Sequence, residues 1–155
     1  MNVILQPHHV NESIPYDLLL LADPDLQKVK TYVGQNQLYL ARNEENELVG
    51  VCVVQVDASA QSWEILNIAV SENFHNQGVG QQIIAQIVTE AKAQQVPKLW
   101  VATANSSIGQ LAFYQKCGFE MYQIVHNYFI KNYPEPIIEN GIVARHQIRL
   151  LMKVS

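Results

Sequence analysis

Near the middle of the 155-residue chain, a turn with two glycines joins an apolar segment to an amphipathic one, and it limits the folds open to the chain more than any other feature. The turn runs Phe74-His75-Asn76-Gln77-Gly78-Val79-Gly80. Before it, Trp63–Val70 is mostly apolar over a length typical of a buried strand. After it, apolar residues recur at helical spacing, namely Val79, Ile83, Ile84, Ile87, Val88 and Ala91. The chain is therefore predicted to pass from a buried strand into a helix at this turn.

Segments with strand and helix patterns alternate along the rest of the chain. The predicted helices are Pro15–Leu21, Pro24–Tyr32 and Ser107–Lys116, and the predicted strands are Asn2–Gln6, Gln37–Arg42, Leu48–Val56, Lys98–Thr103, Phe119–His126 and Arg145–Val154. No repeat or linker interrupts them, and residues 127–141 are interpreted as a long loop within the fold. We therefore expect one domain over residues 1–155, with an α+β (α/β layered) architecture and a mixed sheet.

Composition and charge exclude several classes of protein. A hydrophobic content of 48%, a charged content of 15% and a net charge of -4 predict a compact protein without the basic surface of a general nucleic-acid binder. No apolar run approaches the ~20 residues that span a bilayer, and the N-terminus has no leader pattern. Only Cys52 and Cys117 are present, so we expect a reducing, cytoplasmic setting. The five histidines are scattered, and no metal site is expected.

The glycine turn has the properties of an anion site. Glycines allow a tight turn with a close backbone approach, and N–H groups converge at the start of a helix, where its dipole favours a pyrophosphate. An ordinary strand-to-helix turn is the alternative. A P-loop is excluded because Gln81 and Gln82 follow Gly80 where Lys and Ser or Thr are needed. The dinucleotide fingerprint is excluded because Ile83 stands where a third small residue is required.

Two stretches carry a family resemblance. The first is Asn67-Ile68-Ala69-Val70 followed by His75-Asn76-Gln77-Gly78-Val79-Gly80, and the second is Ala112-Phe113-Tyr114-Gln115-Lys116-Cys117-Gly118-Phe119. In order and separation they resemble the GNAT superfamily of acetyl-CoA-dependent N-acetyltransferases, and the tail resembles that of a small bacterial subgroup. The resemblance implies the GNAT fold, a mixed and mostly antiparallel sheet flanked by helices, with the fourth and fifth strands splayed.

The resemblance also implies where acetyl-CoA lies, which is between the Trp63–Val70 and Lys98–Thr103 strands. The residues expected to bind it are Ile68, Ala69, Val70, His75, Asn76, Gln77, Gly78, Val79, Gly80, Gln81, Asn105, Ser107, Tyr114 and Lys116. Two positions depart from the family pattern. His75 stands where Arg or Gln is usual, and Ser107 stands where Asn is usual, with Asn105 two residues earlier. Either Asn105 or Ser107 is expected to meet the cofactor, and either is also a candidate helix N-cap.

Two side chains are candidates for the chemistry. Tyr114 is expected to be the general acid, because a phenol stays protonated at neutral pH and can donate to a departing thiolate. Without the resemblance, a core tyrosine is the simpler interpretation. Glu64, beside the expected thioester, is the candidate base, and a solvated carboxylate at a strand edge is the alternative. His126 and Glu139 are reserve candidates for the base.

The segment 127–141 is longer than a strand connection requires. Long ordered loops often bind ligands, so we expect it to wall the acceptor pocket, with Tyr133, Glu135 and Glu139 contacting a cationic amine. The expected acceptor-binding residues are Glu64, His126, Tyr133 and Glu139. A dimer contact or a simple connection are the alternatives, and a homodimer stays open. The expected activity is acetyl transfer from acetyl-CoA to a primary amine of a small molecule or peptide, by direct attack in a ternary complex. The alternative is a non-catalytic acyl-CoA sensor.

Overall fold

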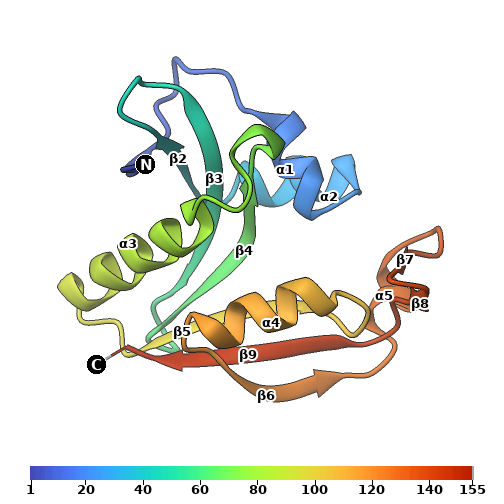
Figure 1. The fold of residues 1–155 in the computed structure, drawn as a ribbon. Helices are drawn as coiled ribbons and strands as arrows, with labels where there is room; N and C mark the ends of the chain where they lie inside the picture. Colours follow the sequence, from blue (N-terminus) through green and yellow to red (C-terminus); the bar gives the residue numbers. More distant parts are fainter. Residues whose placement is uncertain (155) are drawn as a thin grey trace.

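A computed structural model describes residues 1–154. Its main feature is a seven-stranded sheet in the order β1-β2-β3-β4-β5-β9-β6 (Figure 1). The strands are β1 Ile4–Pro7, β2 Gln37–Arg42, β3 Leu48–Asp57, β4 Ser62–Val70, β5 Lys98–Ala104, β6 Glu120–Val125 and β9 Gln147–Lys153. Only the β4–β5 pair is parallel, and the other five pairs are antiparallel. The expected mixed, mostly antiparallel sheet is confirmed.

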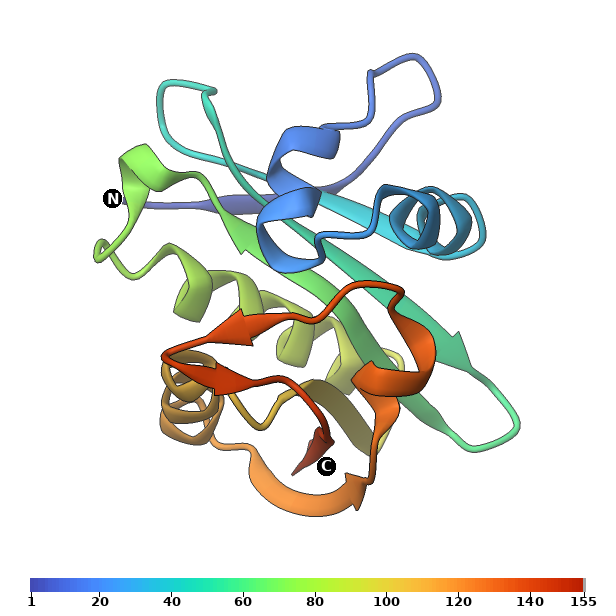
Figure 2. The same ribbon diagram turned by 90° about the vertical axis from the view of Figure 1, so that its right-hand side faces the viewer.

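Helices cover both faces of the sheet (Figures 1 and 2). They are α1 Tyr16–Ala22, α2 Leu26–Val33, α3 Val79–Ala93, α4 Ile108–Lys116 and the short α5 Tyr128–Asn132, with one 3-10 turn, η1, at Glu72–Phe74. One apolar core lies between the sheet and α3 with α4, and it contains Trp63, Ile83 and Leu99. A second core lies under α1 and α2 and contains Leu19 and Val29. The helix predicted after the glycine turn is confirmed, since α3 buries the predicted apolar stripe.

The segment predicted as a loop, residues 127–141, contains regular structure. It forms α5, and it begins a two-stranded hairpin of β7 Ile138–Glu139 and β8 Ile142–Val143. Asn127 starts α5 from a left-handed backbone conformation, with φ of 60°, which asparagine tolerates better than most residues. The sequence pattern missed these elements because each is too short for a periodic signal. Residues 127–141, which we call the C-terminal excursion, lie between α4 and the α1–α2 pair in the view of Figure 2.

Among residues 1–154, no helix is long and apolar enough to cross a membrane. Within the same range, no group of three or more histidine, cysteine or acidic side chains is placed to hold a metal ion.

Candidate functional site

The sheet opens where β4 and β5 separate. Their parallel pairing runs from Ser62 with Lys98 only as far as Ile65 with Val101, and β4 then continues to Val70 without β5 beside it. The expected splay is confirmed, and Figure 1 shows the two halves of the sheet diverging from this point. A separated strand keeps backbone N–H and C=O groups available along its open edge.

An irregularity in β4 decides which side chains face the opening. Val54 pairs with Ile65 and Val53 pairs with Asn67, so Leu66 is an extra residue in β4. Such a bulge interrupts the alternation of side chains between the two faces. As a result Ile65 and Ile68 both pack into the α3 core, whereas the side chain of Asn67 turns to α1 and α2.

The glycine turn closes one end of the opening. Gly78 precedes α3 with φ of 77°, a conformation that costs other L-residues strain, and no side chain caps the N-terminus of α3. The N–H groups of the first turn of this helix therefore stay free to meet an anion. Gly80 is required for another reason. A Cβ atom there would lie 3.0 Å from Cζ of Phe113, so glycine lets α3 approach α4 closely.

A cavity of about 730 Å³ lies against this turn. Of the predicted cofactor residues, its lining contains Ile68, Ala69, Val70, His75, Asn76, Gly78, Val79, Gly80 and Gln81. The His75 ring is turned back, with Nε2 2.8 Å from the carbonyl oxygen of Val70, and so holds the turn to the end of β4. Gln77 is exposed on the turn and is absent from this lining.

A second cavity, of about 790 Å³, continues from the first into the splay. The two share Leu21, Ala22, Ile68 and Gln110 in their linings. The second cavity contains both candidate catalytic residues, Glu64 and Tyr114, and two of the predicted acceptor residues, Tyr133 and Glu139. The fold thus brings together groups that the sequence separates widely.

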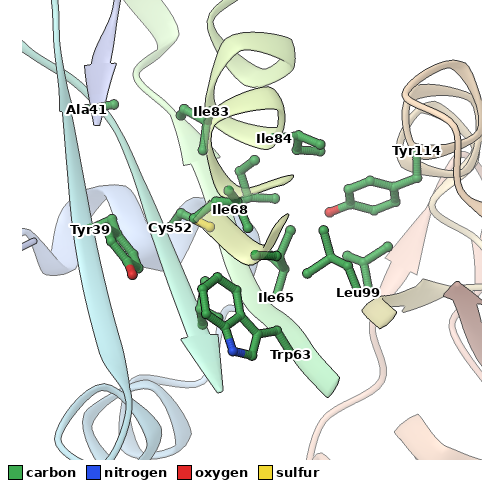
Figure 3. Packing of buried hydrophobic residues seen from close by; sticks show 14 of the residues in the cluster. Tyr39, Ala41, Cys52, Trp63, Ile65, Ile68, Ile83, Ile84, Leu99 and Tyr114 are labelled. Atoms are coloured by element: carbon green, nitrogen blue, oxygen red, sulfur yellow. The ribbon is translucent and has the colours of Figure 1, made fainter. Parts of the chain in front are cut away.

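Tyr114 extends from α4 into the apolar core. It is 5% exposed, and its ring packs edge-on to Phe119 with 5.9 Å between the centroids. Figure 3 shows its hydroxyl pointing toward the side chains of Ile65, Ile68 and Ile84. Burial raises the pKa of this phenol above its ordinary value. The group therefore stays protonated at neutral pH.

Glu64 forms an ion pair at the other side of the splay. Its Oε1 accepts a hydrogen bond of 2.9 Å from Nη2 of Arg149 on β9, and both side chains are about four-fifths buried. The guanidinium of Arg149 also lies over the ring of Trp100, 5.0 Å from its centroid. These contacts hold the carboxylate in one place.

A hydrogen-bond network joins three residues in the wall of the second cavity. The hydroxyl of Tyr133 donates to Oδ1 of Asp23 at 3.1 Å, and the hydroxyl of Tyr32 donates to Oδ2 of the same carboxylate at 3.2 Å. The first of these bonds ties the C-terminal excursion to the end of α1 across 110 residues of sequence. Burial, followed by the nearby Asp23 charge, raises the pKa of Tyr133. The pKa of Tyr32 is raised as well, chiefly by burial.

Asn105 and Ser107 both make contacts within the protein. Oδ1 of Asn105 accepts from the backbone N–H groups of Arg145 and His146, and its Nδ2 donates to the Val143 carbonyl. Asn105 thus fastens residues 143–146, which follow the excursion, to the end of β5, and it is absent from both linings. Ser107 lines the second cavity and donates a 2.8 Å hydrogen bond to Glu139. Neither side chain caps α4.

Besides Gln77 and Asn105, three further predicted residues stand apart from the two cavities. His126 packs edge-on against His146 with 4.8 Å between the ring centroids, while Lys116 and Glu135 are exposed. None of the three is in either lining.

The sequence patterns also missed several residues of the second cavity, including Asp23, Tyr32, Asn67, Tyr128 and Phe129. The one signal that could have pointed to Asn67 is that it is the only polar residue between Ile65 and Val70.

Comparison with known proteins bears on this arrangement. The model of the Acetyltransferase (GNAT) family matches residues 8–119. The chain is 42% identical over 137 residues to the uncharacterized N-acetyltransferase YvbK of Bacillus subtilis (strain 168), covering 88% of this chain and 87% of YvbK.

Two solved structures are similar over nearly the whole chain. A GNAT family acetyltransferase from Elizabethkingia anophelis, with acetyl-CoA bound, is 45% identical with a TM-score of 0.92, and the match covers 98% of each chain. A Bacillus subtilis acetyltransferase in complex with CoA is 37% identical with a TM-score of 0.90, and the match covers 99% of this chain and 100% of the other. With the family match over most of its length and the splayed sheet beside a glycine turn, the chain belongs to the GNAT family of acetyltransferases.

Proposed function

We propose that this acetyltransferase moves an acetyl group from acetyl-CoA to a primary amine, by direct attack of the amine in a ternary complex. The observation that carries the proposal is the continuity of the two cavities. They run from the free N–H groups at the start of α3, past the open edge of β4, to the side chain of Tyr114. The relatives with acetyl-CoA and CoA bound support the same assignment.

In this proposal the glycine turn and the open edge of β4 bind the cofactor. The backbone N–H groups of residues 78–81 hold the pyrophosphate, because the start of a helix attracts anions. The backbone of Ile68–Val70 lies along the reactive end, where an N–H group can stabilise the negative charge that develops on the carbonyl oxygen. His75 supports the turn through its bond to Val70. Acetyl-CoA supplies the activated acetyl group.

Tyr114 is the proposed general acid. Tyr114 lines the second cavity, and burial of its side chain raises its pKa and keeps the phenol protonated at neutral pH. The chemistry calls for a donor there, because a thiolate leaves more easily when a proton reaches its sulfur.

Glu64 is the proposed base, acting directly or through a water molecule. The acceptor arrives as an ammonium ion, and it has to lose a proton before its nitrogen can attack. Glu64 lines the same cavity as Tyr114, and Arg149 holds its carboxylate in position. Replacing Glu64 with glutamine tests directly whether its carboxylate takes the proton.

The walls of the second cavity favour an amine with an apolar or aromatic body. Tyr32, Tyr128, Phe129 and Tyr133 provide aromatic surface, and Asp23 and Glu139 add carboxylates. Aromatic faces and carboxylates both attract ammonium groups. This supports the prediction that the excursion of residues 127–141 walls the acceptor site.

The test is release of free thiol from acetyl-CoA in the presence of four amines: n-butylamine, 2-phenylethylamine, 1,4-diaminobutane and L-alaninamide. Thiol release that depends on an amine, with the acetylated amine detected by mass spectrometry, is the expected result. Binding of acetyl-CoA without release for any amine would support the acyl-CoA sensor instead. The panel also ranks the chemical classes of acceptor.

A further inference from the structure

Asn67 is a buried polar residue in an apolar part of β4, and one of its polar atoms lacks a partner. The residue is 4% exposed, and its Oδ1 makes no hydrogen bond within the described residues 1–154. Buried side-chain acceptors in native proteins nearly always have a partner, so an exception calls for an explanation. This one lies in the wall of the second cavity, the proposed acceptor site.

The orientation of the Asn67 amide is fixed by its neighbours. Nδ2 donates to the carbonyl oxygen of Leu19 and to the hydroxyl oxygen of Tyr32, both at 2.9 Å. These bonds engage both hydrogens of the amide. A flipped amide would place Oδ1 against the Leu19 carbonyl, where two acceptors would face each other. The free atom of Asn67 is therefore an acceptor, and what it lacks is a donor.

The position of Asn67 in β4 suits the reacting nitrogen of the acceptor. The bulge at Leu66 turns Asn67 to the α1–α2 side, and the next residue, Ile68, lines both cavities. A strand advances about 3.3 Å per residue, so Asn67 lies within one to three residues of the backbone proposed to hold the acetyl group. An amine held by the Asn67 side chain would therefore lie near the acetyl group, and attack needs the reacting atoms to approach to about 3–3.5 Å.

We propose that Oδ1 of Asn67 accepts a hydrogen bond from the reacting nitrogen of the acceptor amine and so positions it for attack. The inference rests on the proposed function and extends it to a residue of the acceptor site. Oδ1 exposes less than 1 Å² in the free protein, so the cavity wall shifts slightly when the amine binds.

A neutral amide is well matched to this task. It accepts a hydrogen bond from an ammonium ion and from a neutral amine alike, and it takes no proton itself. A carboxylate at the same place would favour the charged ammonium, which has no lone pair for attack. Asn67 thus holds the nitrogen through its deprotonation, and the proton goes to a separate base.

The experiment uses the amine of the four-member panel that gives the fastest thiol release, with variants Asn67→Ala and Tyr32→Phe. Asn67→Ala is expected to raise the KM of the amine roughly tenfold to a hundredfold and to lower kcat, because the lost bond is made to a group that is charged on arrival. The melting shift that acetyl-CoA produces is expected to stay unchanged in this variant. Tyr32→Phe is expected to raise KM by roughly two- to tenfold, since it removes one of the two bonds that orient the amide.

The matched control is Asn36→Ala. The Nδ2 of Asn36 donates a 2.8 Å hydrogen bond to the backbone carbonyl of Tyr32, and Asn36 lines neither cavity. Its loss is expected to leave the KM of the amine unchanged.

An Asn67→Ala protein with a normal acetyl-CoA shift and a wild-type KM would overturn the inference. If Asn67→Ala shows no cooperative melting, Tyr32→Phe decides: a raised KM with a normal acetyl-CoA shift supports the inference, and an unchanged KM overturns it. If wild-type protein shows no acetyl-CoA shift and no thiol release, the proposed function fails first and the inference falls with it.

Discussion

Replacing Tyr114 with phenylalanine separates a catalytic role for this residue from a structural one. The phenylalanine ring keeps the packing against Phe113 and Phe119, whose centroids lie 5.5 and 5.9 Å from that of Tyr114. Removing the hydroxyl deletes one polar atom beside the second cavity and leaves the ring in place. We therefore expect the free energy of unfolding to change by no more than about 1 kcal/mol, which corresponds to a Tm shift of about 2–4 °C for a chain of this size.

The effect on the reaction is expected to be much larger. A positioned general acid typically contributes about 10²- to 10⁴-fold, equivalent to roughly 3–5 kcal/mol of transition-state stabilisation. Thiol release at saturating amine measures kcat, and thermal melting with and without acetyl-CoA measures fold and cofactor binding. Tyr114→Phe is expected to lose at least about a hundredfold in kcat while keeping its acetyl-CoA shift. A variant with wild-type kcat would refute the assignment, and a large loss of stability would show that the hydroxyl has a structural partner after all.

Three further predictions follow from the same geometry. Gly78→Ala places alanine at φ of 77°, and we expect it to cost about 1–2 kcal/mol of stability and to weaken acetyl-CoA binding measured by calorimetry. The control Gly141→Ala, at φ of 72° and away from both cavities, should cost the same stability and leave acetyl-CoA binding intact. Equal losses of binding in the two variants would contradict the role of the turn. Glu64→Gln is expected to lower kcat by about 10²-fold or more with acetyl-CoA binding retained, and an unchanged pH–rate profile would exclude Glu64 as the base. Burial raises the folded-state pKa of Tyr114, so the stability that the neutral phenol contributes is fully present below its unfolded pKa near 10. Above that pH the contribution falls by up to about 1.4 kcal/mol per pH unit. Urea unfolding between pH 9 and about 11 measures the loss, which should be smaller in Tyr114→Phe.

The sequence predicts those features that arise from local signals. The glycine turn, the stripe of α3 and the apolar strand before the turn are all encoded within about 30 residues, so their order and the fold class follow from the pattern. Tyr114 is a candidate because a short motif surrounds it, and it lies in the wall of the second cavity. Element ends differ by a residue or two, as at α1, where the predicted start at Pro15 becomes Tyr16.

The rest of the site depends on contacts between distant segments. The Leu66 bulge exists only in the register of β4 against β3, and a one-residue change in register decides which face Asn67 occupies. Arg149 reaches Glu64 across 85 residues, and no pattern within β4 reveals that pair. The bond between Tyr133 and Asp23 likewise depends on where the excursion folds back.

Thermal melting with acetyl-CoA tests the central claim most directly, because it asks whether the glycine turn and the splayed strands bind this molecule at all. A ligand at about 100 times its Kd stabilises the folded state by about 2.7 kcal/mol, so the Tm is expected to rise by about 5–10 °C. The rise should shrink in Gly78→Ala and persist in Tyr114→Phe. An unchanged Tm at millimolar acetyl-CoA would contradict the account, since the free N–H groups of α3 would then not bind the pyrophosphate.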